Sequence, residues 1–312
     1  MKRLLIPVVS SFGAGFGIAT YISAQNNNDN QEFPFKPLLA ATIPNSPTNS
    51  IVETGLIEYK QSTVVSKDDL ALANVSRTQQ IMKHGYPSLD NIRMFDNYVL
   101  SYDRRNRVAN WVFEHLTSEK IRPAEGADRG KCEFKEDPNI HPFFRSTNQD
   151  YKGSGYDRGH LAAAANHRSN QSFMDQTFFL SNMAPQVGKG FNRDKWNELE
   201  IEVRKLVKAN DNVWVCTGPL YLPKKEDDNK MYVKYEVIGP QNVAVPTHFF
   251  KVILCEKNGI YSLYSYVLPN LPCDSSIPLS SYMVPIDSIE RAAGFLIFDR
   301  MPRKQIKQIN GR

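Results

Sequence analysis

A histidine stands beside an acid and an arginine in a glycine-rich stretch between residues 153 and 164. Asp157, Arg158 and His160 lie there among three glycines, which permit tight turns and close approach of a ligand to the backbone. Histidine titrates near neutral pH and can take a proton from water, and arginine can hold a phosphate through two parallel hydrogen bonds. The stretch is a candidate proton-transfer site, although a histidine in a polar turn can also be purely structural.

An asparagine stands where an amphipathic helix is expected to begin. Asn192 could cap that helix, or its side-chain oxygen could bind a hard cation. A single amide ligand would leave most of the coordination shell to water, which suits Mg²⁺. Glu200 follows about 80° around the helix from Asn192, so it could hold a metal-bound water or be an exposed helix carboxylate.

A second histidine, His167, follows His160 by seven residues. If both stood on one helix they would share a face, so a zinc pair is a further alternative. No other Cys or His lies nearby at metal-binding spacing, which makes this alternative a weak one.

The elements that must position these residues are mostly strands. The clearest helix spans Asp194 to Ala209, where apolar residues recur at helical spacing. Strands are expected at Tyr98–Tyr102, Asn110–Leu116, Phe178–Leu180, Val213–Cys216, Tyr232–Ile238, Val243–Leu254 and Ile260–Leu268. Asn110–Leu116 is also compatible with two helical turns. Strands without regular βαβ alternation predict an α+β fold with a mixed or antiparallel central sheet flanked by helices.

The first 70 residues differ in composition from the rest. Lys2 and Arg3 precede the uncharged stretch Leu4–Ile22, which is long enough to cross a bilayer. No A-x-A cleavage site ends that stretch, so residues 1–24 are expected to be a targeting or anchor segment. Residues 25–70 are rich in Asn, Pro, Ser and Thr and are expected to be a flexible linker. The folded domain is therefore expected at 71–312.

Composition excludes several classes of protein. Apolar residues make up 41% and charged residues 23% of the 312 residues, which is a globular balance and argues against collagen-like, disordered and polytopic membrane proteins. The net charge of +5 is compatible with a phosphate-bearing partner. The four cysteines are too far apart for a CxxC zinc or redox motif.

Three motifs together resemble the sugar-non-specific ββα-metal nucleases. They are Asp-Arg-Gly-His at 157–160, Leu-Ser-Asn-Met-Ala-Pro-Gln at 180–186, and Asn-Arg-Asp-Lys-Trp-Asn-Glu-Leu-Glu at 192–200. The similarity extends from about Asp96 to Phe298, and within the family it is closer to mitochondrial members. The resemblance implies a ββα-metal nuclease core and hydrolysis of phosphodiester bonds in both DNA and RNA.

The resemblance also implies a role for each site residue. His160 would be the general base and Asn192 the single protein ligand of Mg²⁺, with Mn²⁺ as a possible substitute. Glu200 would orient metal-bound water, and Arg129 would steady the phosphate in the transition state. The remaining residues of the implied site are Arg158 and Asn182 as supporting catalytic residues, and Asp157, Arg193 and Lys189 as nucleic-acid-binding residues. Where close relatives often have Arg after Phe134, this chain has Lys135, which loses the two-pronged contact.

Location and partners follow from the same resemblance. It implies a homodimer in the mitochondrial intermembrane space, with an N-terminal segment that contacts or spans the inner membrane. It further implies nuclear DNA degradation after release during cell death. Two alternatives stay open: a secreted nuclease of the same chemistry, and a catalytically silent nucleic-acid-binding scaffold.

Overall fold

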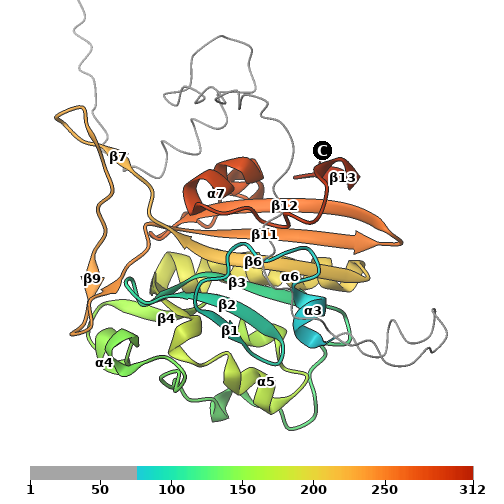
Figure 1. The fold of residues 1–312 in the computed structure, drawn as a ribbon, viewed down its shortest axis with the longest axis horizontal. Coiled ribbons are helices and arrows are strands. Elements are labelled where there is room, and N and C mark those ends of the chain that lie inside the picture. Colours follow the sequence, from blue (N-terminus) through green and yellow to red (C-terminus); the bar gives the residue numbers. More distant parts are fainter. Residues whose placement is uncertain (1–75, 312) are drawn as a thin grey trace, which may run out of the picture. The chain divides into compact units, whose positions relative to one another are not determined.

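A seven-stranded sheet organises the computed structural model, which describes residues 76–311 (Figure 1). The strand order is β1-β2-β3-β6-β11-β12-β13, and neighbours are antiparallel except for β12 and β13. The predicted targeting segment, the linker and the boundary at residue 71 all lie outside the described residues. The expected α+β class with a mixed, mainly antiparallel sheet is confirmed.

The sheet strands are joined by short helices and by smaller strand pairs. The strands of the sheet are β1 (Ile92–Met94), β2 (Tyr98–Asp103), β3 (Val108–Leu116), β6 (Asn212–Leu220), β11 (His248–Lys257), β12 (Ile260–Pro269) and β13 (Ile306–Ile309). The paired strands outside it are β4 (Tyr156–His160) with β5 (Met183–Val187), β7 (Lys224–Lys225) with β8 (Met231–Tyr232), and β9 (Val237–Ile238) with β10 (Val243–Ala244). The α-helices are α3 (Arg77–Ile81), α4 (Asn148–Tyr151), α5 (Gln171–Gln176), α6 (Trp196–Ala209) and α7 (Ile286–Ala293). The short 3₁₀ and irregular helical segments are η2 (Arg129–Lys131), η3 (Pro142–Phe144), η4 (Ala164–Asn166), η5 (Leu180–Asn182), η6 (Gly188–Lys195), η7 (Leu279–Tyr282) and η8 (Arg303–Gln305).

Helix α6 covers one face of the sheet because its apolar residues repeat at helical spacing. Trp196 is fully buried against Phe249 of β11, with ring centroids 5.7 Å apart. The next residue, Phe250, points to the opposite face and meets Phe295, which follows α7. The sheet is therefore buried on both faces, and α6 and α7 lie on opposite sides of it (Figure 1).

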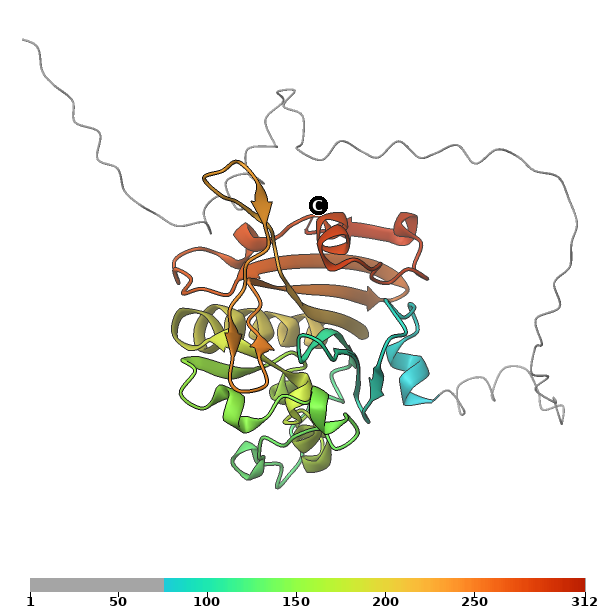
Figure 2. The same ribbon diagram turned by 60° about the vertical axis from the view of Figure 1, so that its left-hand side comes forward.

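The hairpin β4–β5 and η6 lead directly into α6. Strand β4 pairs with β5 over its whole length, from Tyr156 opposite Val187 to His160 opposite Met183. The chain then turns through η6, where Gly190 adopts a φ of 85° that favours glycine. This β–β–α unit carries the Asp157–His160 motif, Asn192 and Glu200, so the predicted ββα core is present (Figure 2).

Four expected elements differ from the structure. The expected strand Val243–Leu254 is broken into β10 and β11, with residues 245–247 between them. Phe178–Leu180 is not a strand: Phe179 makes a single bridge to Lys135, and η5 begins at Leu180, because the chain must turn into β5 there. The expected strand Tyr232–Ile238 is broken into β8 and β9, which pair with different partners. The helix begins at Trp196 and not at Asp194, because η6 occupies the preceding residues.

No helix within residues 76–311 is both long and apolar enough to cross a membrane.

Candidate active site

Strand β4 separates its motif residues onto two faces. Side chains alternate along a strand, so Arg158 and His160 share one face and Asp157 shares the other with Gly159. Gly159 has to be a glycine because Gln186 of β5 lies against it: a Cβ there would come within 2.0 Å of the Gln186 amide oxygen. The glycine therefore lets the two strands pack closely directly beside His160.

His160 is buried, and one of its ring nitrogens is unsatisfied. The residue is 8% exposed, and its Nε2 has no hydrogen-bond partner among the described residues. The ring centroid of Phe178 lies 4.7 Å from that of His160 in a T-shaped contact, and the ring centroid of Phe134 lies 5.9 Å away. Burial, helped by the positive charges of Arg129 and His167, lowers the pKa of His160 to about 3. The imidazole is thus neutral at physiological pH, and its Nε2 is available to accept a proton.

The low pKa of His160 sets the expected pH dependence of cleavage. Because the folded enzyme keeps this base unprotonated at and below pH 6.5, we expect the acid limb of kcat/KM to lie below pH 6.5. Arg129→Gln removes one of the charges that lower this pKa, so the limb should move to higher pH while kcat falls. The check is a pH profile of plasmid nicking for both proteins. An acid limb above pH 6.5 in the wild type, or no movement in the variant, would contradict this assignment.

Asp157 joins Asn192 and Arg193 into one unit. Its Oδ2 accepts from Asn192 Nδ2 at 2.9 Å and from Arg193 Nε at 2.8 Å, while its Oδ1 accepts from Arg193 Nη2 at 2.5 Å. Burial raises the pKa of Asp157, but these hydrogen bonds outweigh it, so the pKa lies below its usual value. With its nitrogen held by Asp157, Asn192 keeps its amide oxygen as the free coordinating atom. The alternative that Asn192 merely caps the helix is not observed, because it lies within η6.

The donor set around Asn192 suits a cation that keeps most of its own water. Across residues 76–311, no group of three or more His, Cys, Asp and Glu side chains could hold a metal ion. One amide oxygen, with the Asp157 carboxylate close by, is a weak site of hard oxygen ligands, of the kind that Mg²⁺ accepts when waters and substrate phosphate complete its coordination. The residues present therefore fit Mg²⁺ and do not fit a zinc centre. The zinc pair of His160 and His167 is also wrong in geometry, since His160 ends a strand.

An open cleft of about 560 Å³ brings several of the predicted residues together. The predicted residues that line it are Arg129, Asp157, Arg158, Asn192 and Arg193. His160 lies behind this wall, beside Phe134, which lines the cleft. Lys189 is exposed on η6 and is not part of the lining. The cleft is strongly basic, as a site for a phosphate backbone requires.

Two cleft arginines are held over aromatic rings. Arg158 lies 4.0 Å from the Phe134 ring centroid, and its Nη1 donates to Asn148 Oδ1 at 2.7 Å. Arg129 lies 5.7 Å from the ring of Phe178, which is the ring that packs against His160. Stacking of this kind fixes a guanidinium without using its hydrogen-bond donors, so the donors of Arg158 other than Nη1 remain available to a phosphate. Sequence reasoning missed Asn148, which no motif singles out.

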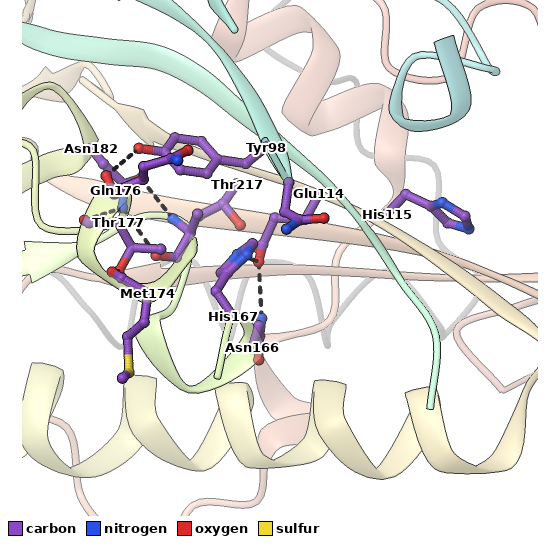
Figure 3. Close-up of polar contacts among 12 residues, drawn as sticks. Tyr98, Glu114, His115, Asn166, His167, Met174, Gln176, Thr177, Asn182 and Thr217 are labelled. Carbon is purple, nitrogen blue, oxygen red and sulfur yellow. Dashed lines mark hydrogen bonds and ion pairs between the residues drawn. The ribbon is translucent and has the colours of Figure 1, made fainter. Parts of the chain in front are cut away.

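Asn182 is a positioning residue and does not face the cleft. It is fully buried, and its amide bridges the segment after His160: Oδ1 accepts from Ala162 N at 2.9 Å, and Nδ2 donates to Ala162 O at 3.0 Å. Nδ2 also donates to Thr177 O at 2.8 Å (Figure 3). These bonds satisfy three buried backbone groups and hold the chain on the C-terminal side of the base.

Replacing Asn182 should reduce stability as well as activity. In Asn182→Ala, three buried backbone groups lose their partner, so we expect a loss of roughly 2–4 kcal/mol in the free energy of unfolding. Asn182→Asp keeps an acceptor for Ala162 N but turns a buried carboxylate oxygen toward the carbonyls of Ala162 and Thr177, so it should be at least as destabilising as the alanine variant. Urea unfolding followed by circular dichroism measures both. Wild-type stability in the alanine variant would contradict the positioning role.

Glu200 lies close to buried charged residues that belong to none of the three sequence motifs. It is half-buried on α6, where burial raises its pKa and the nearby cations Lys251 and Arg204 lower it in part. Lys251 is 2% exposed on β11 and donates to Thr217 Oγ1 at 2.6 Å. A lysine within the apolar run Phe249–Leu254 was the signal that could have identified it.

A buried glutamate ties this layer to the loop that follows His160. Glu114 of β3 is 1% exposed, and its Oε1 accepts from His167 Nε2 at 2.9 Å and from Asn166 Nδ2 at 3.1 Å (Figure 3). Arg204, four residues after Glu200 on α6, donates to Asn166 Oδ1 at 3.3 Å. The contacts thus connect the segment behind the base to the helix that carries Glu200. His167 serves this network and not a metal.

This chain is similar to known nucleases over most of its length. The family model of DNA/RNA non-specific endonucleases matches residues 77–304. "Endonuclease G, mitochondrial" of Caenorhabditis elegans is 48% identical over 308 residues, covering 98% of this chain and 97% of that protein. The human protein of the same name is 54% identical over 218 residues, covering 70% of this chain and 72% of its own. "Mitochondrial nuclease" of Saccharomyces cerevisiae is 38% identical, covering 99% and 89%.

A solved structure shares the fold as well as the sequence. The crystal structure of the EndoG/EndoGI complex contains a chain that is 60% identical, with a TM-score of 0.76. The match covers 77% of this chain and 98% of that one. The chain belongs to the DNA/RNA non-specific endonuclease family, which is metal-dependent and hydrolyses phosphodiester bonds.

Proposed function

We propose that this chain is a Mg²⁺-dependent endonuclease of DNA and RNA in which His160 is the general base and Asn192 the protein ligand of the metal. The observation that carries the proposal is the pairing of a neutral, buried His160 with a free Nε2 and an Asn192 whose amide is fixed by Asp157. The two residues stand on the same β–β–α unit.

His160 supplies the proton acceptor. Its Nε2 takes a proton from the water that attacks the phosphorus, and the low pKa keeps that nitrogen available. The flanking rings of Phe134 and Phe178 exclude bulk water and fix the plane of the imidazole. Asn182 and Glu114 hold the following segment, so the base keeps its place while the substrate binds.

The metal side of the site is built on Asn192. Mg²⁺ held there would polarise the scissile phosphate and neutralise the leaving 3′-oxygen, and Mn²⁺ would serve in its place. Asp157 fixes the amide of Asn192, and Glu200 is suited to orient a bound water through its carboxylate. We assign Asp157 to positioning and not to phosphate contact, since its carboxylate is already paired with Arg193.

Cleft cations bind the backbone of the nucleic acid. Arg129 and Arg158 line the cleft, each held over one of two adjacent rings, Phe178 and Phe134, and can stabilise the charge that develops on the phosphate. Arg193 is 67% exposed, and Lys189 is exposed on η6, so both are placed to contact flanking phosphates. These residues recognise charge and read no base edge, which accounts for a non-specific enzyme.

Location and assembly extend the proposal. Relatives named as mitochondrial, together with the uncharged stretch Leu4–Ile22 after Lys2 and Arg3, support a mitochondrial protein whose residues 1–24 anchor it at the inner membrane, facing the intermembrane space. We further propose a homodimer and release to the nucleus in cell death, where it would degrade DNA. Carbonate extraction of isolated mitochondria and light scattering of the purified protein test the anchor and the dimer.

Nicking of supercoiled plasmid and of a structured RNA by the full chain tests the function. We expect cleavage of both substrates with Mg²⁺ or Mn²⁺ and none with EDTA. A folded protein that binds the plasmid and never cuts it would mean that the chain is a silent scaffold. Cleavage that persists in EDTA would contradict the proposal that the enzyme depends on Mg²⁺.

A further inference from the structure

Exposed aromatic and basic side chains gather next to the cleft but outside it. They come from the turn between β2 and β3 and from η3, two segments far apart in the sequence. The aromatic–arginine patch consists of Arg104, Arg105, Arg107, His141, Phe143 and Phe144. Phe143 is 73% exposed and Phe144 is 36% exposed. Phenylalanines presented to solvent amid arginines point to a ligand with both flat rings and negative charge.

The two segments of the patch are held together by specific contacts. Arg107 Nη2 donates to Phe143 O at 3.2 Å, and its Nη1 donates to Arg105 O at 3.1 Å. The guanidinium carbon of Arg104 lies 5.7 Å from the Phe144 ring centroid. The ring of His141 meets Phe143 edge-on at 4.7 Å. The backbone of the patch is therefore fixed, while the Phe143 side chain remains 73% exposed to solvent.

Local charge favours an anionic occupant. Arg104 and Arg105 are exposed and have no carboxylate partner among the described residues. The nearest acid of the turn, Asp103, accepts from the backbone nitrogens of Arg105 and Asn106, so it is engaged in shaping the turn. Glu136 is paired with Arg145 at 3.5 Å.

The part of the patch that comes from η3 lies a few residues before the cleft in the chain. Phe144 is four residues before Asn148, which lines the cleft and accepts a hydrogen bond from Arg158. At 3.8 Å for each residue, the two Cα atoms are at most about 15 Å apart. A strand lying in the cleft would thus reach Phe144 within about four to five nucleotides, at 3.4 Å for each nucleotide.

We propose that the aromatic–arginine patch is a subsite for unpaired nucleotides of the substrate strand, with bases stacked on Phe143 and phosphates held by Arg104 and Arg105. A stacking site is useful only for bases that are free of the duplex, because paired bases already stack on their neighbours. The subsite favours single-stranded DNA and RNA, and locally melted duplex, over intact duplex. The inference rests on the proposed nuclease function and specifies which substrates its cleft prefers.

Binding in EDTA by the full chain tests the subsite independently of cleavage. The probes are a fluorescently labelled single strand of about 12 nucleotides, its blunt duplex, and a dinucleotide as the short strand, whose single phosphodiester occupies the cleft and leaves no further base for the patch. For Phe143→Ala we expect the Kd of the longer single strand to rise about tenfold, the factor expected for one lost base–aromatic stack. The duplex and the short strand should change less than about twofold.

Matched variants separate stacking from charge and from folding. Phe143→Trp should keep the affinity, whereas Phe143→Leu, which stays apolar, should lose it. Arg104→Gln with Arg105→Gln should weaken single strand and duplex alike and reduce the salt dependence of binding. Leu296→Ala removes another exposed apolar side chain, outside the patch and the cleft, and should leave all three affinities unchanged.

Two results would overturn the inference: an unchanged Kd for the longer single strand in Phe143→Ala, or an equal loss for strand and duplex. Failure of the nuclease proposal looks different, because the wild type would then cut nothing with Mg²⁺ while these binding differences persisted.

Discussion

His160→Ala is expected to lower kcat for plasmid nicking by about 100- to 10,000-fold, the range that a positioned general base contributes. The physical reason is that no other described side chain offers a neutral, buried ring nitrogen beside the cleft. His160 Nε2 is unsatisfied, and Phe134 and Phe178 hold the ring in place. Initial rates at saturating Mg²⁺ measure the change.

Rescue by an external base makes the test specific. In His160→Gly, added imidazole should restore part of the rate, and more basic imidazoles should restore more of it, as expected for general-base catalysis. His248→Gln is the control, because this half-buried histidine also has a lowered pKa but lies on β11 outside the cleft. A rate for His160→Ala within threefold of the wild type would sink the assignment.

Asn192→Ala is expected to raise the Mg²⁺ concentration needed for half-maximal rate by at least 10- to 100-fold, the range seen when even an outer partner of a metal is lost. Asn192 offers the amide oxygen, and the variant removes it together with the hydrogen bond to Asp157. Electron paramagnetic resonance of added Mn²⁺ measures the loss of metal affinity directly, as an increase in the concentration of unbound Mn²⁺.

Two further variants show whether geometry or charge matters at this position. Asn192→Asp supplies an oxygen but sets a carboxylate against Asp157, so it should not restore wild-type affinity. Asp157→Asn should weaken metal binding less than Asn192→Ala, since it only loosens the amide. Asn197→Ala, an exposed asparagine on α6, is the control. Equal Mn²⁺ binding by Asn192→Ala and wild type would contradict the role as ligand.

The sequence predicted those parts of the fold whose pattern is local. The helical repeat of Trp196, Leu199 and Val203 predicted the first residue of α6 to within two residues, because amphipathic spacing depends only on neighbouring positions in the sequence. Phe178–Leu180 looked like a strand because it is apolar, but its burial comes from packing beside His160. The expected strand Tyr232–Ile238 is divided into β8 and β9 because the two parts pair with different strands, and this pairing cannot be predicted from the sequence.

The site residues likewise fall into those that local motifs predict and those that only tertiary contacts define. The motif residues are local in sequence, so Asp157, Arg158, His160 and Asn192 could be found by resemblance. Glu114 could not, since it comes from a different strand and acts only through contacts with Asn166 and His167. Residues that hold others in place are defined by tertiary contacts, and one sequence without relatives carries little trace of those.

The most direct test of the central claim is the single-turnover rate of plasmid nicking as a function of Mg²⁺ for wild type, His160→Ala, Asn192→Ala and the double variant. We predict that His160→Ala lowers the maximal rate and leaves the Mg²⁺ midpoint in place. Asn192→Ala should instead move the midpoint to higher concentration. A shifted midpoint in His160→Ala together with an unshifted one in Asn192→Ala would contradict the division of the site into a base and a metal ligand.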